Sequence, residues 1–344
     1  MTRPHTEAAA VPASSFHCFA TCKVGAQTAF KKEIANLHPA WHPAFMRPGF
    51  VSFKVPAALD PGFTLDSMFA LTHAVSLGTA RMDDAVARVA GVLPEISGNS
   101  VPKLHCWARS TSETRESPNP LDPLARALES SLRQSGAFQP ETRAGAGDLV
   151  VDVMVVDAGM VVIGWHRHHP GHSPFPGGHP PLVLPADAPS RAWMKFEEAL
   201  LWHPKPIVAG QIAVEIGSAP GGTAHALIAR GAKVISIDPA AMDPRLDLHH
   251  IRKLAGGVEP ADLPPSFDWL LIDINDNPGS TIRLATRFIG LSRKRPSLIL
   301  TLKTSDWMDF EHVPDYRRRL ARLGYRDIRA RQLFHGRREI VLLA

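Results

Sequence analysis

Four polar residues in the C-terminal half stand where elements of a nucleotide-binding fold would begin or end. Lys195 lies on a helix-like stretch, Asp273 follows the apolar run FDWLLI, Lys303 follows SLILTL, and Glu339 begins the last apolar run. An isolated lysine is usually solvated, and an acid at the end of a strand often caps the next helix. Lys303 is harder to explain in this way, because it follows a strand that we expect to be buried. A lysine at a sheet edge beside a cofactor loop is a candidate general base, since burial and a cationic neighbour favour its neutral form.

A glycine-rich loop forms the second candidate site. It consists of Gly217, Ser218, Ala219, Pro220, Gly221 and Gly222, and Thr223 follows it. A dinucleotide fingerprint would read G-x-G-x-x-G, but here alanine occupies the third position and proline precedes the paired glycines. Asp238 ends the next strand, 21 residues after Gly217, where an acid can accept hydrogen bonds from ribose hydroxyls. The loop therefore favours S-adenosylmethionine, which has a ribose but no phosphate. The alternative is a tight turn without a ligand.

Alternating strands and helices from residue 190 onward would position these residues. We expect strands at 211–217, 233–238, 267–273, 297–303 and 338–344, and helices at 190–203, 223–231 and 315–324. Such alternation predicts a largely parallel, doubly wound α/β sheet of the Rossmann-like kind. In these folds ligands bind at the carboxyl ends of the strands, and the motifs lie at those ends.

The N-terminal half has a different pattern. A strand at 16–22, a helix at 26–37 and a strand at 49–55 predict a small α+β module of ferredoxin-like type over 16–75. A possible strand at 101–110, a helix at 121–136 and two strands within 149–165, joined at Asp157-Ala158-Gly159, predict a second module over 76–169. Residues 1–15 have no apolar centre, so they are a poor signal peptide and we expect a disordered tail.

A segment rich in proline separates the two halves. Residues 170–189 contain seven prolines and three glycines, which predicts an extended linker before a catalytic domain over 190–344. His166, His168, His169 and His172 lie at or near its start and could ligate a metal. No carboxylate or cysteine completes a ligand set there, so we expect a polar loop and no metal.

Composition narrows the class of protein further. No run of about 18 apolar residues is present, so no membrane span is predicted. Cys18, Cys22 and Cys106 are an odd number without a zinc pattern, which indicates a reducing compartment and a cytoplasmic protein. Residues 281–344 carry 15 Lys and Arg against 6 Asp and Glu. Such a basic surface attracts polyanions, nucleic acid first, although most charge runs are solvated helix faces.

Several motifs together resemble a known family. The stretches SRAWMKFEEA, VEIGSAPGG, DWLLID, LTLK and RREIVLLA resemble the FtsJ-type ribose 2′-O-methyltransferases, which use a Lys-Asp-Lys-Glu tetrad in this chain order. The phrases SPF, LPADAPSRA, K-x-EEA and ARQLFH-x-R-x-E are similar to the THUMP-containing members that modify large-subunit ribosomal RNA, the RlmM family. The resemblance is strong over 173–344 and weak before about residue 120.

The resemblance implies a role for each matching residue. Lys303 would be the general base on the ribose 2′-hydroxyl, and Lys195 would favour the neutral form of Lys303 and hold the nascent alkoxide. Asp273 would orient Lys303 and lie near the methyl donor, and Glu339 would position the lysines or the ribose. The residues from Gly217 to Thr223, with Asp238 and Asp273, would hold S-adenosylmethionine, and no metal is required.

The resemblance also implies partners. The substrate would be a cytidine of 23S ribosomal RNA near the peptidyl-transferase region, in free RNA or in a pre-ribosomal particle. The N-terminal half would be a THUMP-like RNA-binding region, and we expect a monomer without a membrane partner.

Two departures from the family and several competing functions stay open. Thr223 stands where the family usually has Trp, and Leu254 and Ala255 stand where an acid after the third strand usually contacts adenine.

Methylation of cytosine C5 needs a cysteine nucleophile, yet all three cysteines precede the catalytic domain. Methylation of an exocyclic amine would need an Asn/Asp-Pro-Pro-aromatic motif where Asp273-Ile274-Asn275-Asp276 stands. A nicotinamide oxidoreductase is disfavoured by the glycine loop. A non-catalytic ribosome-assembly factor on a relic methyltransferase fold is the main alternative.

Overall fold

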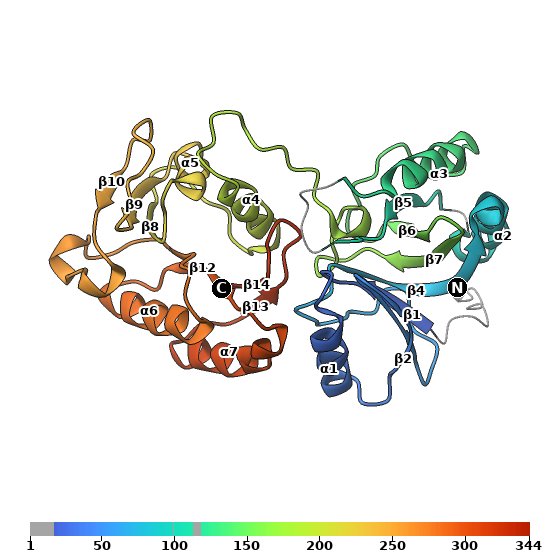
Figure 1. The fold of residues 1–344 in the computed structure, drawn as a ribbon, viewed down its shortest axis with the longest axis horizontal. Coiled ribbons are helices and arrows are strands. Elements are labelled where there is room, and N and C mark those ends of the chain that lie inside the picture. The colour runs from blue at the N-terminus through green and yellow to red at the C-terminus, as the bar shows by residue number, and fades with distance from the viewer. Residues whose placement is uncertain (1–16, 99, 113–117) are drawn as a thin grey trace, which may run out of the picture. The chain divides into compact units, whose positions relative to one another are not determined.

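The computed structural model describes residues 17–98, 100–112 and 118–344 of the 344-residue chain (Figure 1). The tail predicted over 1–15 lies outside these residues. The chain divides into two compact units, an N-terminal unit up to Pro180 and a C-terminal unit over Pro181–Ala344. Among the described residues, no helix has the length and apolar character needed to cross a bilayer.

The N-terminal unit is built on one seven-stranded sheet with strand order β2-β3-β1-β4-β7-β6-β5. Its strands are β1 (His17–Thr21), β2 (His42–Arg47), β3 (Phe50–Lys54), β4 (Thr72–Arg81), β5 (Lys103–Ala108), β6 (Leu149–Asp157) and β7 (Met160–Arg167). Its helices are α1 (Gln27–Leu37), α2 (Ala85–Ser97) and α3 (Asp122–Gln134), with short 3-10 turns at Met82–Asp84 and Pro176–Gly178. All neighbouring strands are antiparallel except β5 and β6, which are parallel.

The predicted elements of this unit are confirmed, and two strands and the helix α2 are additional. The strand, helix and strand expected in the first module are β1, α1 and β3, and the hairpin expected at 157–159 joins β6 to β7. β2 and β4 were not predicted. β4 runs across residue 76, where the sequence predicts a boundary, so the two predicted modules share one continuous sheet. Their assignment as separate modules stays a prediction.

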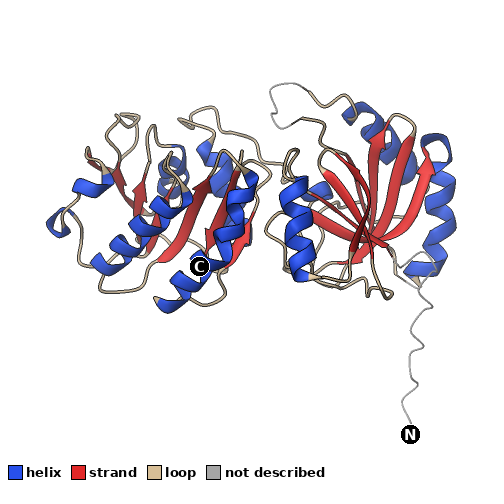
Figure 2. Ribbon diagram, turned by 60° about the horizontal axis from the view of Figure 1, so that its bottom comes forward, coloured by secondary structure: helices blue, strands red, loops and turns tan. Residues whose placement is uncertain are grey.

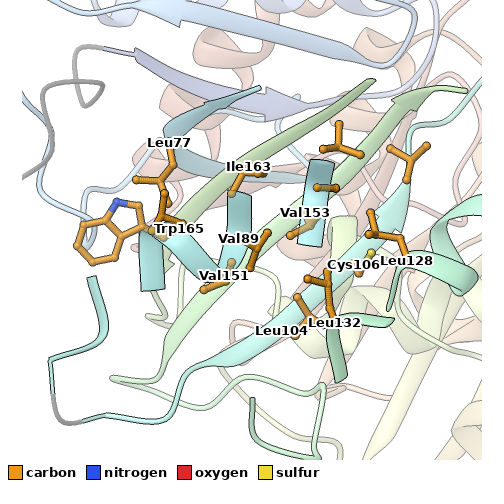
Figure 3. Close-up of a cluster of buried hydrophobic side chains, with 14 of the residues drawn as sticks. Leu77, Val89, Leu104, Cys106, Leu128, Leu132, Val151, Val153, Ile163 and Trp165 are labelled. Carbon is orange, nitrogen blue, oxygen red and sulfur yellow. The ribbon is translucent and has the colours of Figure 1, made fainter. Parts of the chain in front are cut away.

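One face of this sheet carries a large apolar core (Figure 3). Val151 and Val153 of β6 and Ile163 of β7 are fully buried there, and they face Val89 of α2 and Leu132 of α3. Burying an aliphatic side chain of this size contributes about 2 kcal/mol each. These contacts hold α2 and α3 on the sheet.

The first part of the proline-rich segment packs into the N-terminal unit and is not an open linker. Gly177 and Gly178 are buried. A Cβ on Gly177 would lie 2.6 Å from the ring of Trp107, and one on Gly178 would lie 2.5 Å from the carbonyl oxygen of Leu71. Both glycines have positive φ angles, so glycine is required here for backbone conformation and for space.

The C-terminal unit is a Rossmann-like α/β fold with strand order β10-β9-β8-β11-β12-β14-β13. Its strands are β8 (Ile212–Ile216), β9 (Lys233–Ile237), β10 (His249–Ile251), β11 (Trp269–Ile272), β12 (Ser297–Lys303), β13 (Arg329–Arg331) and β14 (Glu339–Leu343). Its helices are α4 (Ala192–Trp202), α5 (Gly222–Ile228), α6 (Pro278–Leu291) and α7 (Val313–Arg322), with 3-10 turns at Ala255–Gly257, Pro260–Asp262 and Trp307–His312.

The doubly wound architecture predicted from the sequence is confirmed in this unit. The five strands from β10 to β12 are parallel, and β14 is antiparallel to β12 and to β13. α4 and α5 cover one side of the sheet, and α6 and α7 cover the other (Figures 1 and 2). In an open sheet of this kind the first crossing point lies between β8 and β11, where the strand order reverses. The glycine loop follows β8 and Asp273 follows β11, so both lie at this point.

Candidate active site

The four polar residues predicted from the sequence meet at the carboxyl edge of the C-terminal sheet. Lys195 Nζ lies 2.6 Å from Asp273 Oδ2 and 3.3 Å from Glu339 Oε1. Lys303 Nζ lies 2.8 Å from Asp273 Oδ1. The carboxylate of Asp273 therefore bridges two ammonium groups, and Lys195 bridges two carboxylates.

Each of the four residues is delivered by a different element. Lys195 projects from α4, which buries Phe196 and Ala199 in the core. Asp273 is fixed directly after β11, because its backbone N–H donates to the carbonyl of Ile216 at 3.0 Å. Lys303 ends β12 and Glu339 begins β14, and the two are paired across the ladder.

The charges in this cluster shift two pKa values. Burial alone would raise the pKa of Asp273, but the ammonium groups of Lys195 and Lys303 outweigh it and lower that pKa. Burial alone would lower the pKa of Lys195, but the carboxylates of Glu339 and Asp273 outweigh it and raise that pKa. At neutral pH Asp273 is therefore an anion and Lys195 a cation.

The backbone of the glycine loop passes close to the end of β11. Gly217 has a φ of +77°, and a Cβ there would lie 2.6 Å from the carbonyl oxygen of Asp273. Gly221 precedes α5 with a φ of +117°, a left-handed conformation that favours glycine. A larger residue at Gly217 would clash with the backbone of Asp273, so glycine is needed at Gly217 for the loop to lie against the polar cluster. Pro220 follows a cis peptide bond.

Asp238 braces the loop from the end of β9. Its Oδ2 accepts the backbone N–H of Ala219 at 3.0 Å, and its Oδ1 accepts that of Ala240 at 2.8 Å. A carboxylate oxygen has more than one lone pair, so both oxygens can accept a further hydrogen bond from a ligand hydroxyl. Ser218 is buried, and its hydroxyl contacts the sulfur of Met242 at 3.5 Å.

One acid of this site, Glu215, was not predicted from the sequence. Glu215 lies within β8 and is buried, and its Oε2 has no hydrogen-bond partner among the residues that the structure describes. Its pKa is raised well above the usual value, first by burial and then by the charge of Asp273, although a hydrogen bond with Thr223 opposes the shift. Glu215, Thr223, Lys195 and Asp273 line one small pocket between α4 and the sheet. An acid within the otherwise apolar run AVEIG was the signal in the sequence.

The end of β10 has the two residues expected there and no acid. Leu254 is 71% exposed, and Ala255 accepts a hydrogen bond from Arg287 through its carbonyl oxygen at 2.7 Å. The segment after β10 therefore presents an exposed apolar side chain at Leu254.

The histidines near the domain boundary do not form the polar loop that we expected. His166 lies within β7, and His166, His168 and His172 are all buried. His172 is stacked between His73 and His166, with ring centroids 3.9 Å apart in each case. His166 Nδ1 lies 2.6 Å from Asp152 Oδ2.

Three of the clustered histidines bring one possible ligand atom each within 4.8 Å of the others, namely His73, His169 and His172. Their hydrogen bonds disfavour ligation. His172 Nε2 accepts the backbone N–H of His73, and His169 Nδ1 accepts that of Gly171. A neutral imidazole has one acceptor, so the other nitrogen of each ring carries the proton. Burial and the neighbouring histidines lower the pKa of His172 well below its usual value, so its ring is neutral at neutral pH.

A basic groove lies along α7 in the same unit as the polar cluster. Tyr316, Arg318, Arg319 and Arg322 line it, together with Asp315, which pairs with Arg318. This groove accounts for part of the basic excess at the end of the sequence. α7 follows Lys303 closely in the sequence, because only a short segment with the 3-10 turn at Trp307–His312 connects the end of β12 to α7.

Comparisons with curated proteins find relatives that are named as ribosomal RNA methyltransferases. The chain is 29% identical over 258 residues to Ribosomal RNA large subunit methyltransferase M of Marinobacter nauticus. The aligned residues cover 71% of this chain and 70% of that protein. It is 27% identical over 277 residues to the protein of the same name from Yersinia pestis, and this alignment covers 76% of this chain and 73% of that protein. The resemblance drawn from the sequence motifs is thereby confirmed. No protein-family model matches the chain.

Solved structures give weaker likenesses. TrmN from Thermus thermophilus has 14% identity and a TM-score of 0.33, over 95% of this chain and 98% of that one. Magnesium protoporphyrin IX methyltransferase from Synechocystis, with bound SAM, has 12% identity and a TM-score of 0.32, over 44% of this chain and 78% of that one.

Proposed function

We propose that this chain is an S-adenosylmethionine-dependent methyltransferase that acts on a ribose 2′-hydroxyl, in a cytidine of 23S ribosomal RNA. The observation that supports the proposal most is the joining of Lys195, Asp273, Lys303 and Glu339 by ion pairs beside a glycine loop. The names of the relatives support ribosomal RNA as the substrate. The choice of the ribose rests on the polar cluster and on the resemblance.

Lys303 is the proposed general base. A ribose hydroxyl is a poor nucleophile at neutral pH, so it needs a group that accepts its proton as the new bond forms. Lys303 is the more exposed of the two lysines, with 28% of its side chain accessible against 21% for Lys195. Lys195 stays protonated between two carboxylates, so its proposed role is to stabilise the developing alkoxide. Asp273 orients the amino groups of both lysines, and Lys303 acts as the base in its neutral form.

The residues around the glycine loop suit a cationic cofactor. Asp238 and Asp273 both lie close enough to Glu215 to raise its pKa, and α5, which follows the loop, carries no lysine or arginine. Acidic surroundings would repel a pyrophosphate and attract a sulfonium and an ammonium group. S-adenosylmethionine would supply an electrophilic methyl group that needs no metal for activation. The residues from Gly217 to Thr223, with Asp238 and Asp273, would hold it.

The partner in this proposal is structured RNA. The groove on α7 offers Arg319 and Arg322 to phosphates, and the N-terminal unit would be the THUMP-like RNA-binding region. In this account the protein works as a cytoplasmic monomer on free RNA or on a pre-ribosomal particle.

A non-catalytic RNA-binding factor is the second candidate, because the acid expected after β10 is replaced by the exposed Leu254. Calorimetry with S-adenosylmethionine alone, together with tritiated methyl transfer to ribosomal RNA from a deletion strain, separates the two. We expect measurable cofactor binding and transfer of the label. If neither is detected, the catalytic proposal fails and the RNA-binding factor is favoured.

A further inference from the structure

Glu198 is a buried acid that lies outside the polar cluster but on the same helix. It follows Lys195 by three residues on α4 and is only 2% exposed. Residues three apart on a helix are neighbours on its surface. A carboxylate in such a position is costly unless its oxygens are hydrogen-bonded.

In the described part of the chain, the hydrogen-bond partners of Glu198 come from one short segment far along the sequence. Its Oε1 accepts the backbone N–H of Phe334 at 2.6 Å. Its Oε2 accepts the backbone N–H of His335 at 2.7 Å and contacts His335 Nδ1 at 2.8 Å. Both carboxylate oxygens are therefore engaged by two consecutive residues. A carboxylate bound in this way fixes the backbone as well as a side chain.

The bound segment leads directly to the polar cluster. Glu339 begins β14 four residues after His335, and its carboxylate lies 3.3 Å from Lys195 Nζ. Between them, Gly336 leaves no room for a side chain, because a Cβ there would lie 2.8 Å from Glu339 Oε1. Glu198 thus binds the residues that immediately precede Glu339 in the chain. The same helix, α4, carries both Glu198 and Lys195.

We propose that Glu198 is a positioning residue that sets the distance between Lys195 and Glu339 by anchoring residues 334–335 to α4. The inference rests on the proposed function only where activity is measured. Loss of this anchor would let the segment before β14 move away from α4. The ion pair between Lys195 and Glu339 would lengthen, although both side chains would still be present.

The chain offers a matched control on the same helix. Glu197 is the neighbouring acid, and its two oxygens each lie 2.6 Å from the guanidinium of Arg230, away from residues 334–335. A Glu197→Gln variant removes one charge from α4 without touching the anchor. Glu198→Gln keeps one acceptor oxygen and so should retain part of the anchor, whereas Glu198→Ala removes it completely.

Amide hydrogen exchange over residues 332–340 tests the anchor without any activity measurement. We expect faster exchange at Phe334 and His335 in Glu198→Ala, an intermediate rate in Glu198→Gln, and the wild-type rate in Glu197→Gln. If Glu198→Ala does not fold, His335→Ala removes one of the three contacts and should also speed exchange at Phe334. Unchanged exchange in Glu198→Gln and His335→Ala would overturn the inference.

Kinetics then separate positioning from general destabilisation. Misplacement by about 1 Å can cost on the order of 100-fold in rate. We expect Glu198→Gln to lower kcat while leaving KM for RNA and the affinity for S-adenosylmethionine near the wild-type values. An equal fall in Glu197→Gln, or a change only in KM, would contradict a positioning role. Absence of transfer in the wild type would reject the proposed function, and the exchange experiment would still stand.

Discussion

Lys303 and Glu339 face each other across the antiparallel ladder between β12 and β14. Directly opposed residues of such a ladder carry their side chains on the same face of the sheet. All five residues of β14 are buried, and a slip by one residue would place Glu339 on the face of the sheet opposite to Lys303. The register of the last strand therefore decides whether the two proposed catalytic side chains lie on the same face.

Replacing Lys303 should abolish methyl transfer and leave the cofactor bound. A general base contributes on the order of 10²–10⁴-fold to a rate, so Lys303→Ala should lose at least that factor in kcat. Calorimetry should show nearly unchanged affinity for S-adenosylmethionine, since the glycine loop is untouched. Lys294→Ala is the control, because Lys294 is paired with Asp268 outside the polar cluster. Normal turnover by Lys303→Ala would show that Lys303 is not the base.

Glu215 should make the protein less stable as the pH rises. Its pKa is raised well above the usual 4.5, first by burial. The folded state therefore keeps this proton at pH values where the unfolded chain has lost it. Its contribution is complete below about pH 4.5 and is lost progressively above that value. A glutamine at this position cannot ionise. The unfolding free energy of Glu215→Gln, measured with urea, should therefore rise relative to that of the wild type between pH 4.5 and 8. Parallel curves for the two proteins would contradict a buried, protonated Glu215.

The buried residues His168 and His172 should make the N-terminal unit sensitive to acid. Burial and the neighbouring histidines lower the pKa of His172 well below 6.5 and that of His168 to about 4. The unfolded chain therefore binds these protons first as the pH falls. The contribution of His168 to the unfolding free energy is complete above about pH 6.5, and it is lost as the pH falls from that value to about 4. Thermal unfolding of His168→Gln should depend less on pH in this window than that of the wild type. An equal dependence in both proteins would remove His168 from the explanation.

Arg319 should contribute to RNA affinity through phosphate contact. Arg319→Ala should weaken RNA binding at low salt and reduce the slope of log K against log salt by about 0.7 to 0.9. Lys233→Ala is the control, because Lys233 is an exposed cation at the amino end of β9, away from the carboxyl edge. A slope that changes equally in both variants would indicate general charge loss instead of a contact in the α7 groove.

Much of the C-terminal fold could be predicted, because its strands are apolar runs that end in glycine or charged residues. α6 was not predicted, although Asn277 and Pro278 carry start signals and the Asn277 side chain accepts the N–H of Ser280. β2 was missed for a physical reason. Its sequence HPAFMR contains a proline and lies on an exposed edge, so it has no alternation of apolar and polar residues.

The polar cluster could be predicted only in part. Lys195, Asp273, Lys303 and Glu339 each stand at the edge of a recognisable element, so their meeting follows from the topology of a parallel sheet. The contact of Glu198 with Phe334 and His335 spans 136 and 137 residues. No local pattern in one sequence encodes such a pair. The stacking of His172 between His73 and His166 was missed for the same reason, because the stack depends on how strands β4 and β7 pair.

The central claim is that the methyl group reaches a ribose oxygen. The most direct measurement is transfer of tritiated methyl groups to 23S ribosomal RNA from a deletion strain, followed by nuclease digestion and identification of the labelled nucleoside. The account predicts a single labelled 2′-O-methylcytidine and no label when Lys303→Ala is used. Label on a base instead of a ribose would contradict the mechanism built on Lys195, Asp273, Lys303 and Glu339.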